Sequence, residues 1–124
     1  MHTPKVSIII PVLKINDYIR ESIPYIAALD YPHWEVLILP NEVSDAEQKE
    51  FSKYENVHLI PSHESRPAFK RDLGAKKAQG EILAFLDDDA YPRSDWLNEA
   101  VKHFENDEIA GVGGPAVTPS DDGL

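Results

Sequence analysis

Residues 82–92, ILAFLDDDAYP, run from an apolar segment directly into three carboxylates, Asp87, Asp88 and Asp89. The apolar residues 82–86 have the length of a strand buried inside a sheet. Open parallel sheets bind ligands at the carboxyl ends of their strands, so this position favours a ligand site. A solvated acidic turn is the alternative, because short acidic motifs also arise by chance.

The oxygen ligands of this triplet favour Mg²⁺ or Mn²⁺ over softer metals. Two carboxylates about 5 Å apart repel each other by roughly 3 kcal/mol at an effective dielectric near 20, and a cation, a proton or open water relieves that repulsion. Mg²⁺ usually binds one or two protein carboxylates together with the phosphates of a substrate. The triplet therefore predicts a divalent metal site that a phosphorylated ligand completes.

Strand-like and helix-like segments alternate along the rest of the chain. The β-branched run VSIIIPV, residues 6–12, is typical of a parallel strand buried on both faces. Further predicted strands are 34–39, 57–60, 82–86 and the weak 109–112. The predicted helices are 17–29 capped by Asn16 and kinked at Pro24, 44–54 with a Ser44–Glu47 capping box, 67–79 ended by a left-handed Gly80, and 95–104 capped by Ser94. This alternation predicts an α/β three-layer sandwich on a mostly parallel sheet.

Length and composition limit the class of protein. A chain of 124 residues holds at most one domain, and 42% hydrophobic with 27% charged residues is typical of a soluble globular fold. No apolar run approaches the roughly 18 residues of a membrane-spanning helix. The N-terminus has no signal-peptide pattern, so we expect a cytoplasmic location. The absence of cysteine excludes disulfides, thiolate metal sites and a cysteine nucleophile.

The charge of the chain restricts its partners. Twelve basic and twenty-two acidic residues give a net charge of −10, which disfavours nonspecific nucleic-acid binding. A nucleotide would be repelled unless a cation and local basic groups intervened. One dense basic cluster is available on the predicted helix 67–79, and either phosphate contact or a solvated helix face explains it. It consists of Lys70, Arg71, Lys76 and Lys77.

Three stretches of the chain carry recognisable motifs: VSIIIPVLKINDYIRESI (6–23), YPHWEVLIL (31–39) and RDLGAKKAQGEILAFLDDDAYPRSDWL (71–97). These stretches resemble the family 2 glycosyltransferases, which use nucleotide sugars on the A-type glycosyltransferase fold. The last stretch joins an Arg-x-x-Gly helix, a Gly-Glu turn and an Asp-x-Asp strand end in the order and spacing of the family. The resemblance implies a Rossmann-like, nucleotide-sugar-binding half of such a transferase. We expect residues 1–124 to form this single domain as the donor-binding portion of a longer protein.

The resemblance also implies roles for nucleotide-binding residues. Pro11 and Val12 match the start of the loop that contacts the base and ribose, and Lys70 and Arg71 lie where the helix of the family approaches the nucleotide. Asp88 matches the position that approaches the ribose.

At the positions for the metal and the nucleobase, the chain matches the pattern of the family in some residues and departs from it in others. Asp89 matches the ligand of the divalent metal, Mn²⁺ or Mg²⁺, and Asp87 helps to form its shell. The two carboxylates that usually follow the second strand are replaced here by Pro40 and Asn41. An amide can still pair with a base edge, but the charge is gone, so the identity of the base stays open. Asp72 stands where the family usually has Asn.

The reaction implied by the resemblance is an inverting transfer from a nucleotide-diphosphate sugar to a hydroxyl acceptor. The expected acceptor is a saccharide, a cell-envelope polymer or a lipid-linked glycan. A full-length protein could therefore lie at the cytoplasmic face of a membrane, held there by parts that are not in this chain. The catalytic base of the family follows the Asp-x-Asp segment by a long interval. We therefore assign no catalytic residue and expect the base beyond residue 124, since Asp121 and Asp122 are typical of a solvated tail.

Other functions compete with sugar transfer. One alternative is a non-catalytic nucleotide or metal-binding fragment, if the chain is truncated, or a degenerate transferase domain, if Asn41 marks a decayed site. A phosphoacceptor receiver domain needs acidic residues after the first strand, where Leu13, Lys14 and Ile15 stand instead. Dinucleotide binding is disfavoured, because no glycine-rich fingerprint follows that strand.

Overall fold

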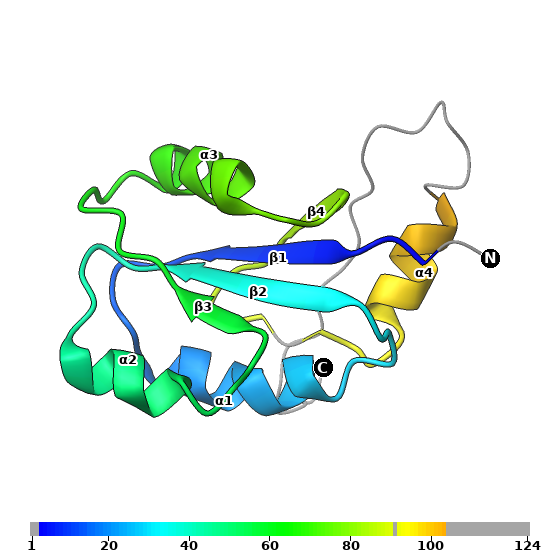
Figure 1. Cartoon of the computed structure of the whole chain (residues 1–124), viewed down its shortest axis with the longest axis horizontal. Helices are drawn as coiled ribbons and strands as arrows, with labels where there is room; N and C mark the ends of the chain where they lie inside the picture. Colours follow the sequence, from blue (N-terminus) through cyan, green and yellow to red (C-terminus); the bar gives the residue numbers. More distant parts are fainter. Residues whose placement is uncertain (1–2, 91, 104–124) are drawn as a thin grey trace.

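Figure 1 shows a computed structural model of the chain, which describes residues 3–90 and 92–103. Within these residues four strands alternate with four helices. The strands are β1 (Val6–Pro11), β2 (Trp34–Leu39), β3 (Val57–Leu59) and β4 (Ile82–Phe85). The helices are α1 (Asp17–Ala27), α2 (Asp45–Phe51), α3 (Pro67–Lys77) and α4 (Trp96–His103). The elements predicted within this range are confirmed with ends shifted by a few residues, and the predicted strand 109–112 lies outside the described residues.

The strands form one parallel sheet in the order β3-β2-β1-β4. β1 lies inside it, where Ile9 is in register with Leu37 on one side and with Phe85 on the other. All pairings among the described strands are parallel, so the sheet is more regular than the mostly parallel one predicted. The nearly continuous β-branched run of β1 suits this place, because a central parallel strand is covered on both faces.

Helices cover both faces of the sheet (Figure 1). The chain steps from β1 to β2 to β3 in one direction and then returns past β1 to β4. Crossovers between parallel strands are right-handed, so reversing the direction of travel moves the connecting helix to the opposite face. α1 and α2 accordingly lie on one face and α3 on the other (Figure 1). The predicted three-layer sandwich is confirmed.

The core is divided between the two faces by the two-residue period of the strands. The larger part contains alternate residues of β1 and β2, such as Ile8 and Val36, packed with α1 and with Leu97 of α4. The smaller part contains Ile9 and its neighbours under α3. Its buried members are Ile9, Leu37 and Leu39, with Leu73, Ala78 and Ile60 packed against them.

The capping signals of the sequence are followed at some helix ends and not at others. The capping box of α2 is complete, because Ser44 Oγ accepts from Glu47 N at 3.1 Å and Glu47 Oε1 accepts from Ser44 N at 3.0 Å. α1 continues through Pro24 as a single element, so the predicted kink does not divide it. α4 begins at Trp96, one residue later than predicted, and the Ser94 carbonyl accepts from Asp30 N at 2.7 Å. No helix in the described part of the chain is long and apolar enough to cross a bilayer.

The prediction of a left-handed Gly80 is wrong. α3 ends at Lys77, the capping residue Ala78 has extended backbone, and Gly80 does not have a left-handed φ. A Cβ at this glycine would lie 2.6 Å from Ser7 Oγ and 2.8 Å from Lys5 O. Glycine is therefore required by the close approach of this turn to β1 and not by its backbone conformation.

A buried carboxylate, Glu35, holds the same turn against the sheet. Glu35 is 3% exposed and accepts from the Ser7 hydroxyl at 2.6 Å and from Gln79 N at 2.7 Å, while Lys5 Nζ lies 3.9 Å from its other oxygen. Burial acts to raise the pKa of Glu35, but the hydrogen bonds and the nearby positive charges outweigh it and lower the pKa below its ordinary value. The ionised form of Glu35 therefore stabilises the fold.

Replacing Glu35 by glutamine tests this contribution through its pH dependence. Because the folded pKa is lowered, the stabilisation is complete above the unfolded pKa of about 4.3 and is lost as pH falls through the folded value. Glu35→Gln should lower the free energy of unfolding at pH 7 by about 1–3 kcal/mol, measured by urea denaturation, and the deficit should shrink below about pH 4. Glu55→Gln, on an exposed turn, is the control. A deficit independent of pH would contradict the assignment.

Gly74 brings α3 close to the sheet. A Cβ at this position would lie 2.7 Å from Ile9 Cγ2 and 3.3 Å from Leu39 Cδ1. Glycine inside a helix costs about 1 kcal/mol relative to alanine, so the close packing has to compensate for that loss. The glycine of the Arg-x-x-Gly motif therefore acts here in helix-to-sheet packing.

Gly74→Ala should lower the free energy of unfolding by about 1–3 kcal/mol, because overpacking against Ile9 outweighs the better helix propensity of alanine. Chemical denaturation measures the change. Ile9→Ala makes room for the added methyl group, so the double variant should lose less stability than the sum of the two single variants. Additive losses would show that the clash with Ile9 does not decide the effect of the substitution.

Candidate functional site at the carboxyl edge of the sheet

The loops after β1 and β4 lie at the switch point of the sheet topology. β1 leads to β2 on one side, whereas β4 lies on its other side. Open α/β sheets bind ligands in the crevice outside the carboxyl ends of strands at such a point. The loop after β2 joins this edge, because Asn41 N donates to Leu13 O at 2.9 Å and Val12 N donates to Leu39 O at 3.2 Å.

Asn16 links the loop after β1 to the carboxylate triplet. Its Nδ2 donates to Asp88 Oδ2 at 2.9 Å, and its Oδ1 caps α1 by accepting from Ile19 N at 2.9 Å. With the contact between Asn41 and Leu13, this bond shows that the loops after β1, β2 and β4 converge. The sequence indicated Asn16 only as a cap. A sequence signal for its second role does exist. Asn16 follows β1, and the neighbouring strand β4 leads into carboxylates with which an amide can pair.

Asp87 and Asp89 are exposed, and their carboxylates make no hydrogen bond or ion pair within the described residues. Ala90 N donates to Asp87 O at 3.1 Å and closes the turn that contains the triplet. No group of three or more His, Cys, Asp or Glu side chains in residues 3–90 and 92–103 converges as a metal-binding set. A preformed three-carboxylate cluster is thus absent from this range. The exposed oxygens of Asp87 and Asp89 fit a Mg²⁺ or Mn²⁺ ion that takes its remaining ligands from phosphate and water.

Lys70 is the most unusual side chain of the site, because it is only 1% exposed. From the first half of α3 it reaches the loops after β1 and β2, where its Nζ donates to Val12 O and, at 2.5 Å, to Asn41 Oδ1. Burial lowers the pKa of Lys70, and the charge of Glu64 acts in the opposite direction. The ammonium group therefore ties two loops of the predicted nucleotide site together.

Most of the predicted nucleotide-binding residues lie at one edge of the sheet. Pro11, Val12, Asn41 and Lys70 lie together where β1 and β2 end, and the side chain of Val12 is in the core. Asp88 joins the same edge through its bond to Asn16. The predicted contacts of these residues with a nucleotide stay predictions.

The basic cluster of α3 does not act as one surface. Lys70 points into the fold, whereas Arg71, Lys76 and Lys77 are exposed. Arg71 follows Lys70 at the end of α3 nearest the site, so its guanidinium is available to an anionic ligand. Lys76 and Lys77 lie in the last turn, where cations interact favourably with the helix dipole, and they fit the solvated-face interpretation.

The loop after β3 also borders the site. Ser62 N donates to Pro40 O at 2.9 Å and His63 N donates to Asn41 O at 2.9 Å, so this loop holds the loop after β2. His63 has a left-handed φ of 57°, which is uncommon outside glycine although histidine is enriched there. Its Nδ1 lies 3.0 Å from Glu42 Oε1. No spacing or motif in the sequence distinguishes His63.

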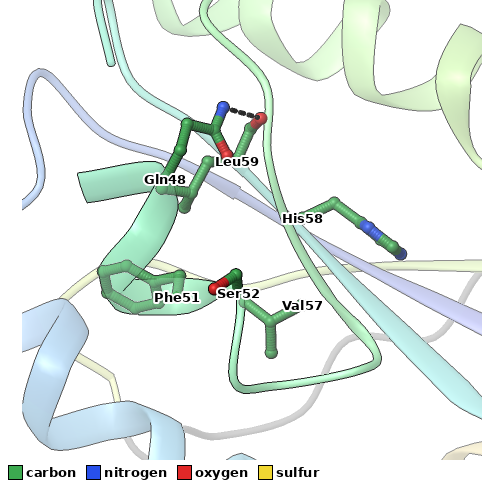
Figure 2. A pocket seen from close by; sticks show the side chains of 6 residues that line it. All are labelled: Gln48, Phe51, Ser52, Val57, His58 and Leu59. Carbon is green, nitrogen blue, oxygen red and sulfur yellow. Dashed lines mark hydrogen bonds between the residues drawn. The ribbon is translucent and has the colours of Figure 1, made fainter. Parts of the chain in front are cut away.

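A pocket of about 160 Å³ lies elsewhere, between α2 and β3 (Figure 2). Gln48 Nε2 donates to Leu59 O at 3.3 Å in its wall. The lining residues are Gln48, Phe51, Ser52, Val57, His58 and Leu59. None of them belongs to the loops after β1, β2 or β4, so this pocket is not part of the candidate site.

Sequence comparison agrees with this geometry. Residues 7–124 match the family described as Glycosyl transferase family 2. The chain belongs to glycosyltransferase family 2. Among its relatives within family 2, glycosyltransferase AglE of Haloferax volcanii is 31% identical over 118 residues, which cover 90% of the chain and 39% of AglE. Poly(ribitol-phosphate) beta-N-acetylglucosaminyltransferase TarS of Staphylococcus aureus is 26% identical over 130 residues, which cover 94% of the chain and 23% of TarS.

Solved structures resemble this family 2 chain in fold. Mannosyltransferase PcManGT of Pyrobaculum calidifontis, in complex with GDP-Man and Mn²⁺, gives a TM-score of 0.73 at 24% identity over 85% of this chain and 33% of that one. S. aureus TarS in complex with UDP-GlcNAc gives 0.69 at 22% identity over 90% and 37%. The likeness establishes the A-type glycosyltransferase fold. The chain spans well under half the length of each protein compared.

Substitutions at Asn16 separate its two contacts. Asn16→Ala removes both the cap and the donor to Asp88 and should lower the free energy of unfolding by about 1 kcal/mol, whereas Asn16→Ser keeps a capping oxygen and should cost less. Thermal unfolding measures both. In a double-mutant cycle, Asn16→Ser and Asp88→Ala should be coupled, while Asn16→Ser and Asp87→Ala should be additive. Equal coupling to both aspartates would contradict the assigned bond.

Proposed function

We propose that the chain is the donor-binding part of a transferase that uses a nucleotide-diphosphate sugar and a divalent metal, and transfers the sugar with inversion to a hydroxyl acceptor. The observation that carries this proposal is the Asn16–Asp88 bond, which brings an Asp-x-Asp strand end across the switch point to the loop after β1. Family membership supports sugar transfer as the class of reaction.

The comparisons support the proposed class of donor and metal. PcManGT has been solved with GDP-Man and Mn²⁺, and TarS with UDP-GlcNAc. The proposed metal ligands are Asp87 and Asp89, whose carboxylates have no partner among the described residues. A bound Mn²⁺ or Mg²⁺ would neutralise the negative charge that grows on the diphosphate as it leaves.

The residues of the chain have distinct proposed roles around that leaving group. Asp88, held by Asn16, is oriented toward the ribose, and Arg71 supplies a positive charge for the diphosphate. The acceptor hydroxyl attacks the anomeric carbon from the face opposite the diphosphate, the bond from carbon to the diphosphate oxygen breaks, and the hydroxyl proton passes to a base. No described residue is assigned as that base. Charge on the bridging oxygen is largest after cleavage, so groups that stabilise it favour the transition state over the bound donor.

The proposed acceptor is a saccharide, a polymer of the cell envelope or a lipid-linked glycan. The name of TarS, a poly(ribitol-phosphate) transferase, supports an envelope polymer. A cytoplasmic location, including the cytoplasmic face of a membrane, belongs to the same proposal, because nucleotide sugars are the donors that it requires.

A non-catalytic nucleotide-binding module is the second candidate function. It is favoured by Asn41, which replaces a carboxylate expected from the resemblance and is committed to Lys70. Incubation with a panel of nucleotide sugars and acceptor saccharides separates the two functions, because only a transferase releases nucleoside diphosphate in step with a glycosylated product.

Asp89→Ala should remove most of the metal-dependent part of nucleoside-diphosphate binding. Titration calorimetry with UDP and GDP, with and without Mn²⁺, measures this part as the difference between the two affinities. Removing one of two carboxylate ligands should reduce it by about tenfold or more, in line with losses seen when the surroundings of a metal are altered. Glu55→Gln removes a charge far from the site and should leave binding unchanged. An unaltered metal-dependent affinity in Asp89→Ala would remove Asp89 from the metal site.

A further inference from the structure

The backbone acceptors at the ends of β1 and β2 are already occupied within the fold. Each of the four carbonyls that follow these strands accepts at least one hydrogen bond from a described residue. Val12 O accepts from Lys70 Nζ, Leu13 O from Asn41 N, Pro40 O from Ser62 N and Asn41 O from His63 N. Each of these main-chain acceptors therefore already has a donor within the fold.

The orientation of the Asn41 amide follows from its contact with Lys70. An ammonium group is only a donor, so the atom 2.5 Å from Lys70 Nζ has to be the amide oxygen. The amide Nδ2 then points away from Lys70 and donates to none of the described residues. It is also not buried, since no described buried side-chain nitrogen or oxygen lacks a partner. Asn41 therefore offers a hydrogen-bond donor at the surface of the site.

The charge of Lys70 reinforces this polarity. Its Nζ donates to two oxygens, neither of them a carboxylate, and leaves one N–H of its three without an acceptor in the described structure. The charge of Glu64 acts on Lys70 from outside these contacts, in the direction that raises its pKa. The Lys70 cation therefore lies beside the amide of Asn41, where its charge favours an electronegative ligand atom.

We propose that Lys70 and Asn41 form a specificity-determining pair, in which Lys70 orients the Asn41 amide so that its NH₂ group donates to the nucleobase. The site then prefers bases whose pairing-edge ring nitrogen is a hydrogen-bond acceptor. This inference rests on the proposed function. Cytosine N3 and adenine N1 are such acceptors, whereas the matching nitrogens of uracil and guanine carry a hydrogen and would face the Asn41 amide hydrogens. Sites that match polar groups discriminate strongly, because a mismatch leaves a polar group unpaired.

Titration calorimetry with CDP, ADP, UDP and GDP in the presence of Mn²⁺ tests the pair on the full chain. CDP or ADP should bind about tenfold or more tightly than UDP and GDP. Asn41→Asp supplies a second oxygen in place of the amide nitrogen, and it should reverse the order in favour of UDP or GDP. The carboxylate also pairs with Lys70, so this variant should fold at least as well as the parent.

Lys70→Met removes the donor that orients the amide, so the amide can rotate and the preference should fall to less than about threefold. Lys77→Met, on the exposed end of α3, is the matched control and should keep the preference of the parent. If Lys70→Met does not fold, the reversal in Asn41→Asp decides the question by itself.

The outcomes separate this inference from the proposed function. Tighter binding of UDP or GDP by the parent chain, or the same order of affinities in Asn41→Asp, overturns the specificity pair and leaves the donor-binding proposal intact. Absence of binding for all four nucleoside diphosphates with Mn²⁺ overturns both. A preference for CDP or ADP that Asn41→Asp reverses supports both.

Discussion

The burial of β1 on both faces is the constraint on which the other features depend. A parallel strand in the middle of a sheet exposes neither side, so helices must cover it above and below. Ile9 brings α3 so close that residue 74 has to be glycine. Ser7, on the same face, is fully buried; its hydroxyl donates to Glu35 and accepts from Gly80 N. The apolar packing and the buried polar network thus both follow from the burial of β1.

The sequence predicted the order and type of the elements well, because their signals are local. The β-branched run of β1 and the capping box at Ser44 depend on neighbouring residues only. Gly80 was assigned to the right turn for the wrong reason, since close packing and a left-handed backbone both select glycine. Periodicity alone does not distinguish these two demands, because the contact involves residues 73 positions away.

The candidate site was predicted in its position but not in its internal contacts. Strand ends carry their loops to a common edge, so the Asp triplet could be located from the sequence. The direction of each carboxylate could not, because Asp88 is oriented by Asn16, 72 positions earlier. Lys70 has the same character: its burial depends on Val12 and Asn41, which come from two different loops. Contacts of this kind are set by tertiary structure.

α3 is fastened to the sheet at its two ends by side chains of opposite charge. Near its start, the Lys70 cation binds the loops after β1 and β2, and just beyond its end the Glu35 anion binds the backbone of Gln79. Detaching either end would leave a buried charge without its partners, which is far more costly than breaking a solvent-exposed contact. Rigid-body sliding of α3 along the sheet is therefore more costly than bending of an exposed loop.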